Sequence, residues 1–477
     1  VDDHEGDPMA ANLDPVVRET DAFAMHMEED PLLRSTIVAV ALFDGTPDWD
    51  VLVDRMERAT RLAPSFRSLL VHPPLRLGPV RRVPDPDFDL GWHLRRVAAP
   101  APHTLEEVIN FACTSGMTAF DPARPLWEFT LVEGLTEGRS ALVMKVHHSL
   151  TDGIGAIQLA QHVVDLQREP ADPGPMPDVP PADRTSTARL AIDSISSNMS
   201  RTAAFAGDRL RRLPGDMVDL ARNPIGAASR SLKVAGSIAN FVRPVTHTLS
   251  PLMTGRRLAW RYQALDVPFA ELRRAGHAAG GTVNDAFMAA VAGGLARYHD
   301  RHGLPVEELR VTMPVSVRAS DDAEGGNRIT LARIVIPVGL ADPAERIRAI
   351  RSISRQWRSE PSIPYTNAIA GALNLLPRTI TGDMLKHVDF TASNVPGFSD
   401  AIYVGGARVT AFYPFGPPIG ASANFTLMSY AGTCNIGLTA DRGAITNPEE
   451  LMSCLVEGFD EVLGLGGGQD DSVRRPT

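Results

Sequence analysis

The chain has 477 residues, of which 44% are apolar and 22% charged, a composition that fits two globular domains with large cores. Its formal net charge of −10 argues against general nucleic-acid binding. The cysteines Cys113, Cys434 and Cys454 are far apart and odd in number, which favours a reducing compartment over a disulfide framework.

Targeting and membrane signals are weak. The first twelve residues, VDDHEGDPMAAN, are acidic and polar and do not resemble a secretory signal. No apolar run reaches the roughly 18 residues of a membrane span. The sequence therefore predicts a cytoplasmic protein that is soluble or attached peripherally to a membrane. A covalent serine mechanism is not expected either, because no G-x-S-x-G motif is present.

The first half of the chain predicts an α/β domain over residues 19–168, preceded by a flexible stretch over residues 1–18. Helical patterns cover Asp21–Glu29, Asp48–Ala63, Leu105–Gly116 and the segment from Gly155 to about Arg168. Strand patterns cover Ser35–Phe43, Glu128–Val132 and Ala141–Val146. The last two strands are expected to form an antiparallel pair.

The most informative stretch is Ala141–Gly155, in which a compact apolar run ends in His147 and His148. Asp152-Gly153 and an amphipathic helix follow. This order places both histidines at the carboxyl end of a strand, where α/β folds usually build their sites. Because neighbouring side chains in a strand point to opposite faces, at most one histidine can face a given cleft. The alternative is a pair of structural histidines beside an Asp-Gly turn.

The residue types in this stretch suit proton transfer. A neutral imidazole can take a proton from a hydroxyl and return it to a leaving group, so one histidine is a candidate general base. Asp152 can cap the next helix or pair with an arginine and hold the loop rigid, and Gly153 permits close backbone approach. A metal site is not expected, because adjacent strand histidines cannot reach one ion.

A boundary follows the first domain. Seven of the fifteen residues in Glu169–Asp183 are Pro or Gly, and we place a linker over residues 169–257. From Arg184 to Arg261 thirteen Arg or Lys residues face four Asp, so this segment carries about +9 and the rest about −19. Two interpretations stay open: a helical crossover with a solvated basic face, or a surface for anionic lipid or nucleotide phosphates.

The second domain is predicted over residues 258–465, with a tail over residues 466–477. A small-residue helix within Gly280–Tyr298 must be buried, and Thr282 is its expected cap. Further patterns predict strands at Val311–Val317 and Leu331–Val338, a helix from Asp342, a hairpin over Ser422–Ala440 and a last helix from Asn447.

Several of these stretches together resemble a known family. HHSLTDG (His147–Gly153) matches the HHxxxDG signature of the CoA-dependent acyltransferase superfamily. Four further stretches resemble, in the right order, those of the bacterial wax ester synthase/diacylglycerol acyltransferases: PLW at Pro125–Trp127, VND at Val283–Asp285, MPVSVR at Met313–Arg318 and SNVPG at Ser393–Gly397. The likeness covers about residues 17–465, and the DFGWG motif of plant acyltransferases in this superfamily is missing.

The resemblance implies an α/β fold of two chloramphenicol-acetyltransferase-like domains, with mixed, largely antiparallel sheets flanked by helices and an active-site channel between them. Acyl-CoA would enter from one side as a substrate, and diacylglycerol or a long-chain alcohol from the other, with no cofactor. His148 would take the proton from the acceptor hydroxyl as its oxygen attacks the thioester. No acyl-enzyme is required.

The same resemblance names the site residues. The catalytic group would be His148, His147, Asp152 and Gly153. The substrate-binding group would be Pro125, Leu126, Trp127, Asn284, Asp285, Arg318, Asn394, Pro396 and Gly397.

Each substrate-binding motif also has a structural interpretation. Trp127 could be a core residue, and Asn284 and Asp285 could cap their helix. Arg318 could be a surface charge or a buried partner of Asp152. On physical grounds alone, residues 394–397 would form a turn.

Three other functions remain open at this point. The chain could transfer acyl groups from a carrier protein or to a complex lipid, or form amides as a condensation domain. It could also be a non-catalytic lipid-binding protein with this fold, which the intact His148, Asp152 and Gly153 argue against. The basic, apolar linker would suit contact with a membrane or lipid-droplet surface.

Overall fold

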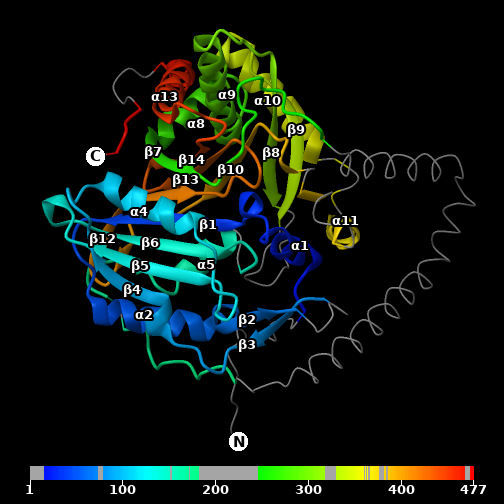
Figure 1. Cartoon of the computed structure of the whole chain (residues 1–477). Coiled ribbons are helices and arrows are strands. Elements are labelled where there is room, and N and C mark those ends of the chain that lie inside the picture. Colours follow the sequence, from blue (N-terminus) through cyan, green and yellow to red (C-terminus); the bar gives the residue numbers. More distant parts are fainter. Residues whose placement is uncertain are drawn as a thin grey trace, which may run out of the picture.

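The computed structural model describes residues 16–72, 79–150, 153–170, 172–181, 245–316, 329–358, 360, 363, 366–374, 381–382, 385–467 and 473–476. These residues form two six-stranded mixed sheets, one built mainly from the first half of the chain and one from the second, and a small two-stranded sheet (Figure 1). Helices flank the two large sheets, as the sequence predicted. Asp152, Arg318 and most of the basic segment lie outside the described residues.

The first sheet has the strand order β11-β12-β1-β6-β5-β4, and its β4–β5 pair is parallel while the other pairs are antiparallel. In chain order its strands are β1 Thr36–Phe43, β4 Leu94–Ala98, β5 Trp127–Glu133, β6 Ser140–His147, β11 Tyr403–Val404 and β12 Ala407–Phe415. The helices of this half are α1 Glu19–Met27, α2 Trp49–Leu62, α3 Leu90–His93, α4 Leu105–Met117 and α5 Gly153–Ala160. A separate hairpin pairs β2 Ser68–Val71 with β3 Arg81–Pro84.

The second sheet has the order β7-β14-β13-β10-β8-β9, in which β10 runs parallel to both of its neighbours. Its strands are β7 Trp260–Pro268, β8 Glu308–Ser316, β9 Ile329–Pro337, β10 Phe390–Pro396, β13 Ala423–Tyr430 and β14 Thr433–Asp441. The helices of this half are α8 Phe269–Ala278, α9 Val283–Arg301, α10 Pro343–Arg358, α11 Thr366–Leu373 and α13 Pro448–Gly464.

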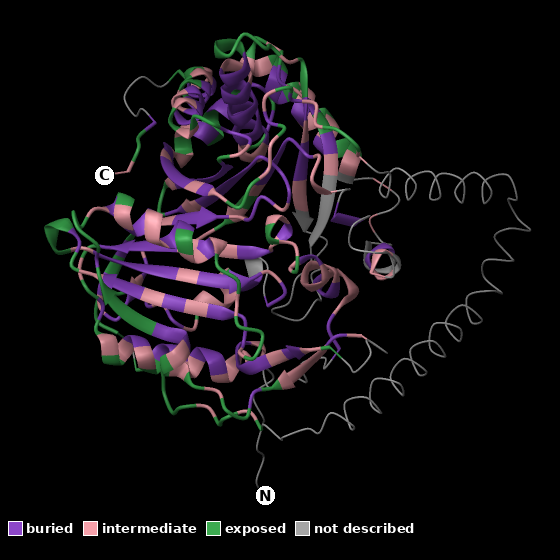
Figure 2. Cartoon of the chain, viewed as in Figure 1, coloured by how far each residue is buried: buried purple, intermediate pink, exposed green. Residues whose placement is uncertain are grey.

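The core of the second half is built around α9, which is buried along most of its length (Figure 2). Its small residues let α13 approach closely. A Cβ on Gly294 would lie 2.9 Å from Leu455 Cα, and one on Gly458 of α13 would lie 2.5 Å from Ala290 O. Larger residues at these two positions would push the helices apart and open the core.

The two halves share a strand. Although β12 belongs to the second half in sequence, it pairs with β1 in the first sheet, from Val38 opposite Phe415 to Phe43 opposite Val409. The backbone N–H of Phe412 also donates to Asn435 Oδ1 of β14, at 3.0 Å. The first sheet is therefore completed by residues from the far end of the chain, a link that the predicted domain boundaries did not include.

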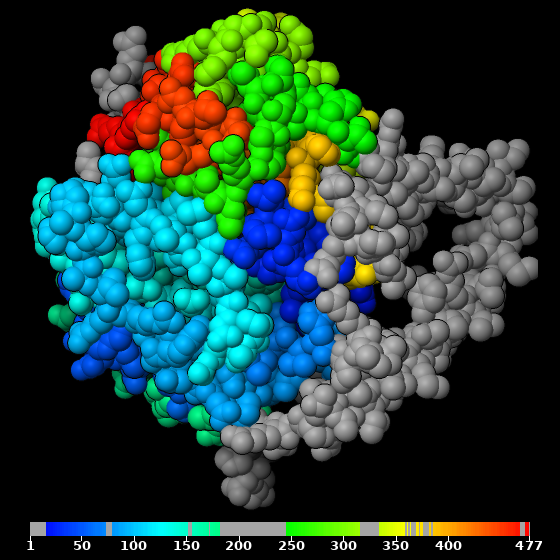
Figure 3. Space-filling model, in the orientation of Figure 1, coloured from blue at the N-terminus to red at the C-terminus, as the bar shows by residue number. Residues whose placement is uncertain are grey.

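The segment around α1 bridges the halves from the other side. Asn374 Nδ2, which follows α11, donates to the Glu19 carbonyl at 3.1 Å, and Lys386 Nζ pairs with Asp30 at 2.6 Å. In Figure 3 this blue segment fills the surface between the first half and the elements of the second half. The segment around α1 is thus part of the contact between the halves.

Two sequence predictions near domain ends are wrong. The helix after Gly155 ends at Ala160 rather than near Arg168. Residues 16–18 are not loosely packed, because Val16 and Val17 are buried. In the predicted tail, the backbone of Arg474 exchanges two hydrogen bonds with Asp266 of β7.

Candidate active site

The pairing of β6 with β1 separates the two histidines. Leu142, Met144 and Val146 of β6 face a large cavity, and His148 follows them in the same alternation. His147 belongs to the opposite face, where it lies in register with Thr36. The expectation that only one of the two histidines faces a given cleft is therefore confirmed, and the residue in the cavity is His148.

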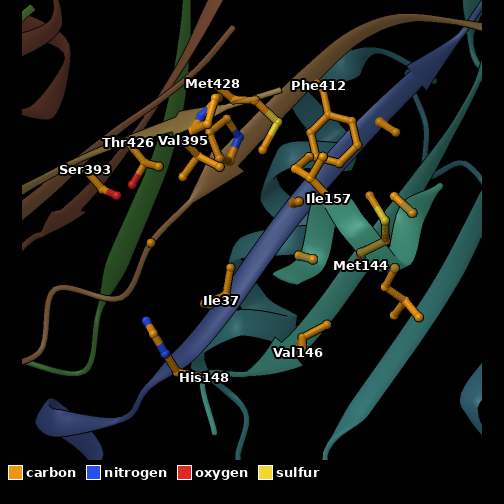
Figure 4. Close-up of a pocket in the computed structure, with 18 of the residues that line it drawn as sticks. Ile37, Met144, Val146, His148, Ile157, Ser393, Val395, Phe412, Thr426 and Met428 are labelled. Atoms are coloured by element: carbon orange, nitrogen blue, oxygen red, sulfur yellow. The ribbon is translucent and has the colours of Figure 1, made fainter. Parts of the chain in front are cut away.

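The cavity lies between the two halves and encloses about 290 Å³. Its lining is mostly apolar and continues from His148, past Ile37 and Val146, to Phe412 and Met144 (Figure 4). The apolar part is completed by alternate residues of β1, by residues of α5, and by the chain around residues 402–409. Among the described lining residues no side chain is charged, so the cavity suits an uncharged, largely hydrocarbon ligand.

Polar groups are unevenly distributed over the lining. From the first half, the described residues contribute only His148 as a polar side chain. The second half contributes all the others, on β8, β10 and β13: Thr312, Thr391, Ser393, Asn394, Asn424 and Thr426. In Figure 4, Ser393 and Thr426 lie across the cavity from His148. One imidazole on an apolar wall thus faces a wall of hydroxyl and amide groups.

His147 is a structural residue with a defined tautomer. Its Nδ1 accepts from the backbone N–H of Ser149 at 3.2 Å and lies 2.7 Å from Ser149 Oγ, so Nε2 carries the proton. Nε2 lies 3.2 Å from Glu28 Oε2 and donates to it. The His147 side chain is 1% exposed, and Glu28 gives its buried N–H group a hydrogen-bond acceptor.

Glu28 connects the His147 ring to the backbone that holds His148. Its Oε2 also accepts from the backbone N–H of Ser35 at 2.9 Å. The Ser35 carbonyl in turn accepts from the backbone N–H of His148 at 2.9 Å. One carboxylate oxygen therefore holds both His147 and the chain that fixes His148.

A buried lysine lies on the same face as His147. Lys145 is 1% exposed, pairs with Glu128 at 3.4 Å and lies 4.2 Å from the centre of the Phe120 ring. Burial lowers the pKa of the Lys145 ammonium, which the carboxylate of Glu128 partly offsets. This lysine faces away from the cavity and serves the structure behind the site.

The PLW residues support the cavity wall without lining it. Trp127 is fully buried, and its Nε1 donates to the Phe66 carbonyl at 2.8 Å. Its ring packs against Phe66 and Phe129, which do line the cavity. Pro125 and Leu126 are also buried, and the Leu126 carbonyl accepts from the backbone N–H of His147 at 2.9 Å. The core interpretation of Trp127 thus fits, rather than direct contact with a ligand in this cavity.

The VND residues begin α9 and are not among the cavity's lining residues. Asp285 is buried and accepts from the backbone N–H of Thr282 at 2.9 Å, while Thr282 Oγ1 accepts from the backbone N–H of Asp285 at 3.3 Å. This reciprocal pair is a capping box. The structure therefore places Asn284 and Asp285 at a helix cap, as the structural interpretation stated.

The SNVPG residues do reach the cavity. Asn394 and Pro396 line it, but they belong to strand β10, so the expectation of a turn is wrong. Gly397 follows this strand and lies beside β13, where a Cβ would lie 2.2 Å from the Ser429 carbonyl oxygen. Only glycine permits that approach of the backbone.

Two predicted residues cannot be placed. Asp152 and Arg318 lie outside the described residues, and Gly153 is the first residue of α5. The proposed contact between Asp152 and Arg318 therefore stays a prediction.

The sequence missed Glu28 and the polar wall opposite His148. Glu28 is 119 residues from His147, and nothing local marks it as a partner. The wall had a weak signal, since Ser393 is part of the SNVPG motif and Thr426 lies in a predicted strand of alternating polar residues.

Other reactive groups are not poised for chemistry. All three cysteines are buried, and burial raises the pKa of the Cys113 thiol to about 11 and that of Cys434 to about 12. Both thiols therefore stay protonated near neutral pH. Within the described ranges, no group of three His, Cys, Asp or Glu side chains could hold a metal ion, and no helix has the length and apolar character needed to cross a bilayer.

Comparisons with known proteins agree on the family. Residues 18–287 match the model of the wax ester synthase/diacylglycerol acyltransferase catalytic domain, and residues 325–462 match that of the WS/DGAT C-terminal domain. A putative diacylglycerol O-acyltransferase of Mycobacterium tuberculosis is 37% identical over 458 residues, covering 94% of this chain and 91% of the relative. A second one from that organism, a probable diacylglycerol O-acyltransferase, is 32% identical, covering 86% of this chain and 90% of the relative.

Solved structures share the fold. The wax ester synthase/diacylglycerol acyltransferase from Marinobacter aquaeolei has a TM-score of 0.63 at 22% identity, covering 95% of this chain and all of that one. The starter condensation domain of rhizomide synthetase, in complex with C8-CoA and Leu-SNAC, has a TM-score of 0.62 at 13% identity and covers 96% and 95% of the two chains. The two family matches, which span most of its length, and the relative at 37% identity place the chain in the wax ester synthase/diacylglycerol acyltransferase family.

Proposed function

We propose that this enzyme moves a long-chain acyl group from acyl-CoA to the hydroxyl of diacylglycerol or of a long-chain alcohol. The observation that carries the proposal is the position of His148, a single imidazole on the otherwise apolar wall that the first half gives to the cavity. An acyl chain would occupy the apolar part of the cavity, and the reacting thioester and hydroxyl would meet at His148.

His148 would act as a general base. Its unprotonated ring nitrogen takes the proton of the acceptor hydroxyl while the oxygen attacks the thioester carbon, giving a tetrahedral oxyanion. The intermediate collapses, the carbon–sulfur bond breaks, and the imidazolium returns the proton to the leaving thiolate. An ester and free CoA are the products, and no bond to the enzyme forms.

The arrangement behind the ring supports this role. The backbone of His148 is fixed by the Ser35 carbonyl, and Ser35 is fixed by Glu28. A base held in place before the substrates bind costs less free energy of ordering in the transition state. His147, whose N–H already donates to Glu28, is in this proposal a positioning residue.

A thiol-release assay tests the function. Purified full-length enzyme is given hexadecanoyl-CoA with diacylglycerol, with hexadecanol, or with no acceptor, and released CoA is measured together with the lipid product. We expect release that depends on an acceptor and matches ester formation. Failure with both acceptors, combined with ester formation from an acyl-carrier protein or on a complex lipid, would overturn the proposal.

We also propose peripheral contact with an anionic membrane or lipid-droplet surface. The support is the sequence of Arg184–Arg261, which concentrates about +9 in an otherwise acidic chain. Each basic residue near such a surface is worth about 1 kcal/mol. Wild-type protein should co-sediment with vesicles rich in anionic lipid at low salt and less at high salt, and replacing Arg209, Arg211 and Arg212 by Glu should release it. Equal recovery with neutral and anionic vesicles would contradict this contact.

A further inference from the structure

Five polar side chains of the second sheet line the cavity in two rows. Thr391 of β10 is in register with Thr312 of β8 on one side and with Asn424 of β13 on the other. Two residues further along β10, Ser393 is in register with Thr426. All five face the cavity, so the order of the strands places them on one surface, which we call the polar ladder.

Part of the polar ladder is satisfied internally. Thr426 Oγ1 donates to Asn424 Oδ1 at 2.6 Å, and Asn424 Nδ2 donates to the Pro417 carbonyl at 3.1 Å. Thr391 Oγ1 donates to the Ala423 carbonyl at 3.3 Å. These three residues are therefore held in fixed orientations by the protein itself.

The other two hydroxyls of the polar ladder differ. Within the described part of the chain, neither Thr312 Oγ1 nor Ser393 Oγ has a hydrogen-bond partner, although the Thr312 side chain is buried. Thr312 lies opposite Thr391 on the neighbouring strand β8, and Ser393 lies two residues further along β10. The polar ladder thus offers two hydroxyl donors to whatever occupies the cavity, and a hydroxyl donor needs an acceptor oxygen.

The candidate ligands differ in the oxygens that they carry. A long-chain alcohol has only the hydroxyl that reacts, whereas a diacylglycerol carries ester carbonyls a few bonds from its free hydroxyl. The pantetheine arm of acyl-CoA carries amide carbonyls near its sulfur. A wall with free donors favours a ligand that brings carbonyls, because an apolar ligand would leave those donors buried without partners.

We propose that the polar ladder binds a carbonyl group carried next to the reacting centre, and we assign that carbonyl to the ester groups of a glyceride acceptor. The assignment rests on the proposed acyl transfer at His148, across the cavity from Ser393 and Thr426 (Figure 4). The acceptor hydroxyl must reach His148, which places the neighbouring ester groups toward the opposite wall. The enzyme then prefers diacylglycerol to a long-chain alcohol.

The double variant Thr312→Val, Ser393→Ala tests the assignment. It removes both free hydroxyls with little change in volume, and it breaks no hydrogen bond between described residues, so the melting temperature should not change. At saturating hexadecanoyl-CoA we expect the apparent KM for diacylglycerol to rise about tenfold. The KM for hexadecanol and the KM for hexadecanoyl-CoA should stay at the wild-type values.

Thr439→Val is the matched control. Thr439 of β14 lies in register with Asn424, one strand beyond the polar ladder, and its buried hydroxyl has no partner among the described residues. It does not line the cavity, so its removal should leave all three KM values unchanged.

Three results would overturn the assignment. A rise in the KM for hexadecanoyl-CoA with both acceptors would mean that the carbonyl is the pantetheine amide. An equal fall in kcat with both acceptors would indicate a role in the reaction step, and unchanged kinetics would mean that no carbonyl is bound there. Failure of the proposed function is distinguishable from all three, because the wild-type enzyme would then release no CoA with either acceptor.

Discussion

The two faces of the β1–β6 strand pair place adjacent histidines in opposite surroundings. On the cavity face, His148 projects from an apolar wall toward the second half of the molecule. On the other face, His147 is buried with its N–H on Glu28 and its second nitrogen on Ser149. A histidine whose two nitrogens are both occupied cannot also accept a substrate proton, so His147 is not suited to act as a base.

The sharpest test of this comparison is His148→Ala. Because this ring is the proposed base and lines a cavity, its loss should lower kcat by about 10²–10⁴-fold while leaving the unfolding free energy nearly unchanged. Steady-state kinetics and urea unfolding measure the two quantities. A variant that unfolds more easily and still turns over at the wild-type rate would reverse the roles assigned to the two histidines.

On the opposite face, Glu28→Ala should act mainly on stability. It leaves the buried His147 N–H and the Ser35 N–H without their acceptor, which costs about 2–4 kcal/mol of unfolding free energy. The kcat should fall severalfold, because the Ser35 carbonyl that holds His148 is no longer fixed. Glu28→Gln keeps an acceptor oxygen and should restore most of the stability.

Asp54 of α2 is exposed and supplies the control, since Asp54→Ala should change the unfolding free energy by less than about 0.5 kcal/mol. If Glu28→Ala were as stable as Asp54→Ala, the Glu28 carboxylate would not be what holds the Ser35 and His148 backbone.

The alternation along β1 offers a third test. Ala39 faces the cavity, whereas its neighbour Val40 packs against the core under α4. Ala39→Leu should lower kcat/KM for hexadecanoyl-CoA by about tenfold, and less for octanoyl-CoA, with little effect on stability. Val40→Ala should instead cost about 2–3 kcal/mol of unfolding free energy and spare chain-length preference. The same acyl-chain profile in both variants would argue against the cavity as the acyl site.

The smallest effect concerns pH. Burial lowers the pKa of His93, which stacks on Trp127, and that of His299 in the second half. Since the unfolded chain then binds more protons than the folded one, stability is full above the unfolded pKa of about 6.5 and decreases as the pH falls through it. Thermal unfolding between pH 7.5 and 5.5 measures the slope, which His93→Gln should reduce. A slope that does not change in this variant would mean that other groups cause the decrease.

Local patterns predicted much of the molecule from sequence. Alternation along Ala141–Val146 was sufficient to separate the faces of His147 and His148, and Thr282 caps α9 as expected. The turn Ala431-Gly432 joins β13 and β14, with both residues at positive φ. These features depend on residues close together in the chain, where period and turn chemistry are informative.

Contacts between distant segments could not be predicted in the same way. Residues 394–396 have the composition of a turn, but pairing with β13 makes them a strand, so tertiary context overrides propensity. Glu28 meets His147 across 119 residues of chain, and the helix before Glu28 is itself in contact with the second half. From the sequence, Trp127 could either line the cavity or belong to the core. The structure places it in the core, because Trp127 packs against Phe66 and it is Phe66 that lines the cavity.

The pairing of β12 with β1 has a consequence for how this protein folds during synthesis. During synthesis, the ribosome releases β1 and β6 long before residues 407–415, so the first sheet must wait with one edge of β1 unpaired. That edge belongs to a strand whose Val38 and Val40 are fully buried in the finished fold. An open apolar edge invites pairing with another chain. The first half expressed alone should therefore aggregate, and supplying the second half as a separate chain during expression should recover soluble protein.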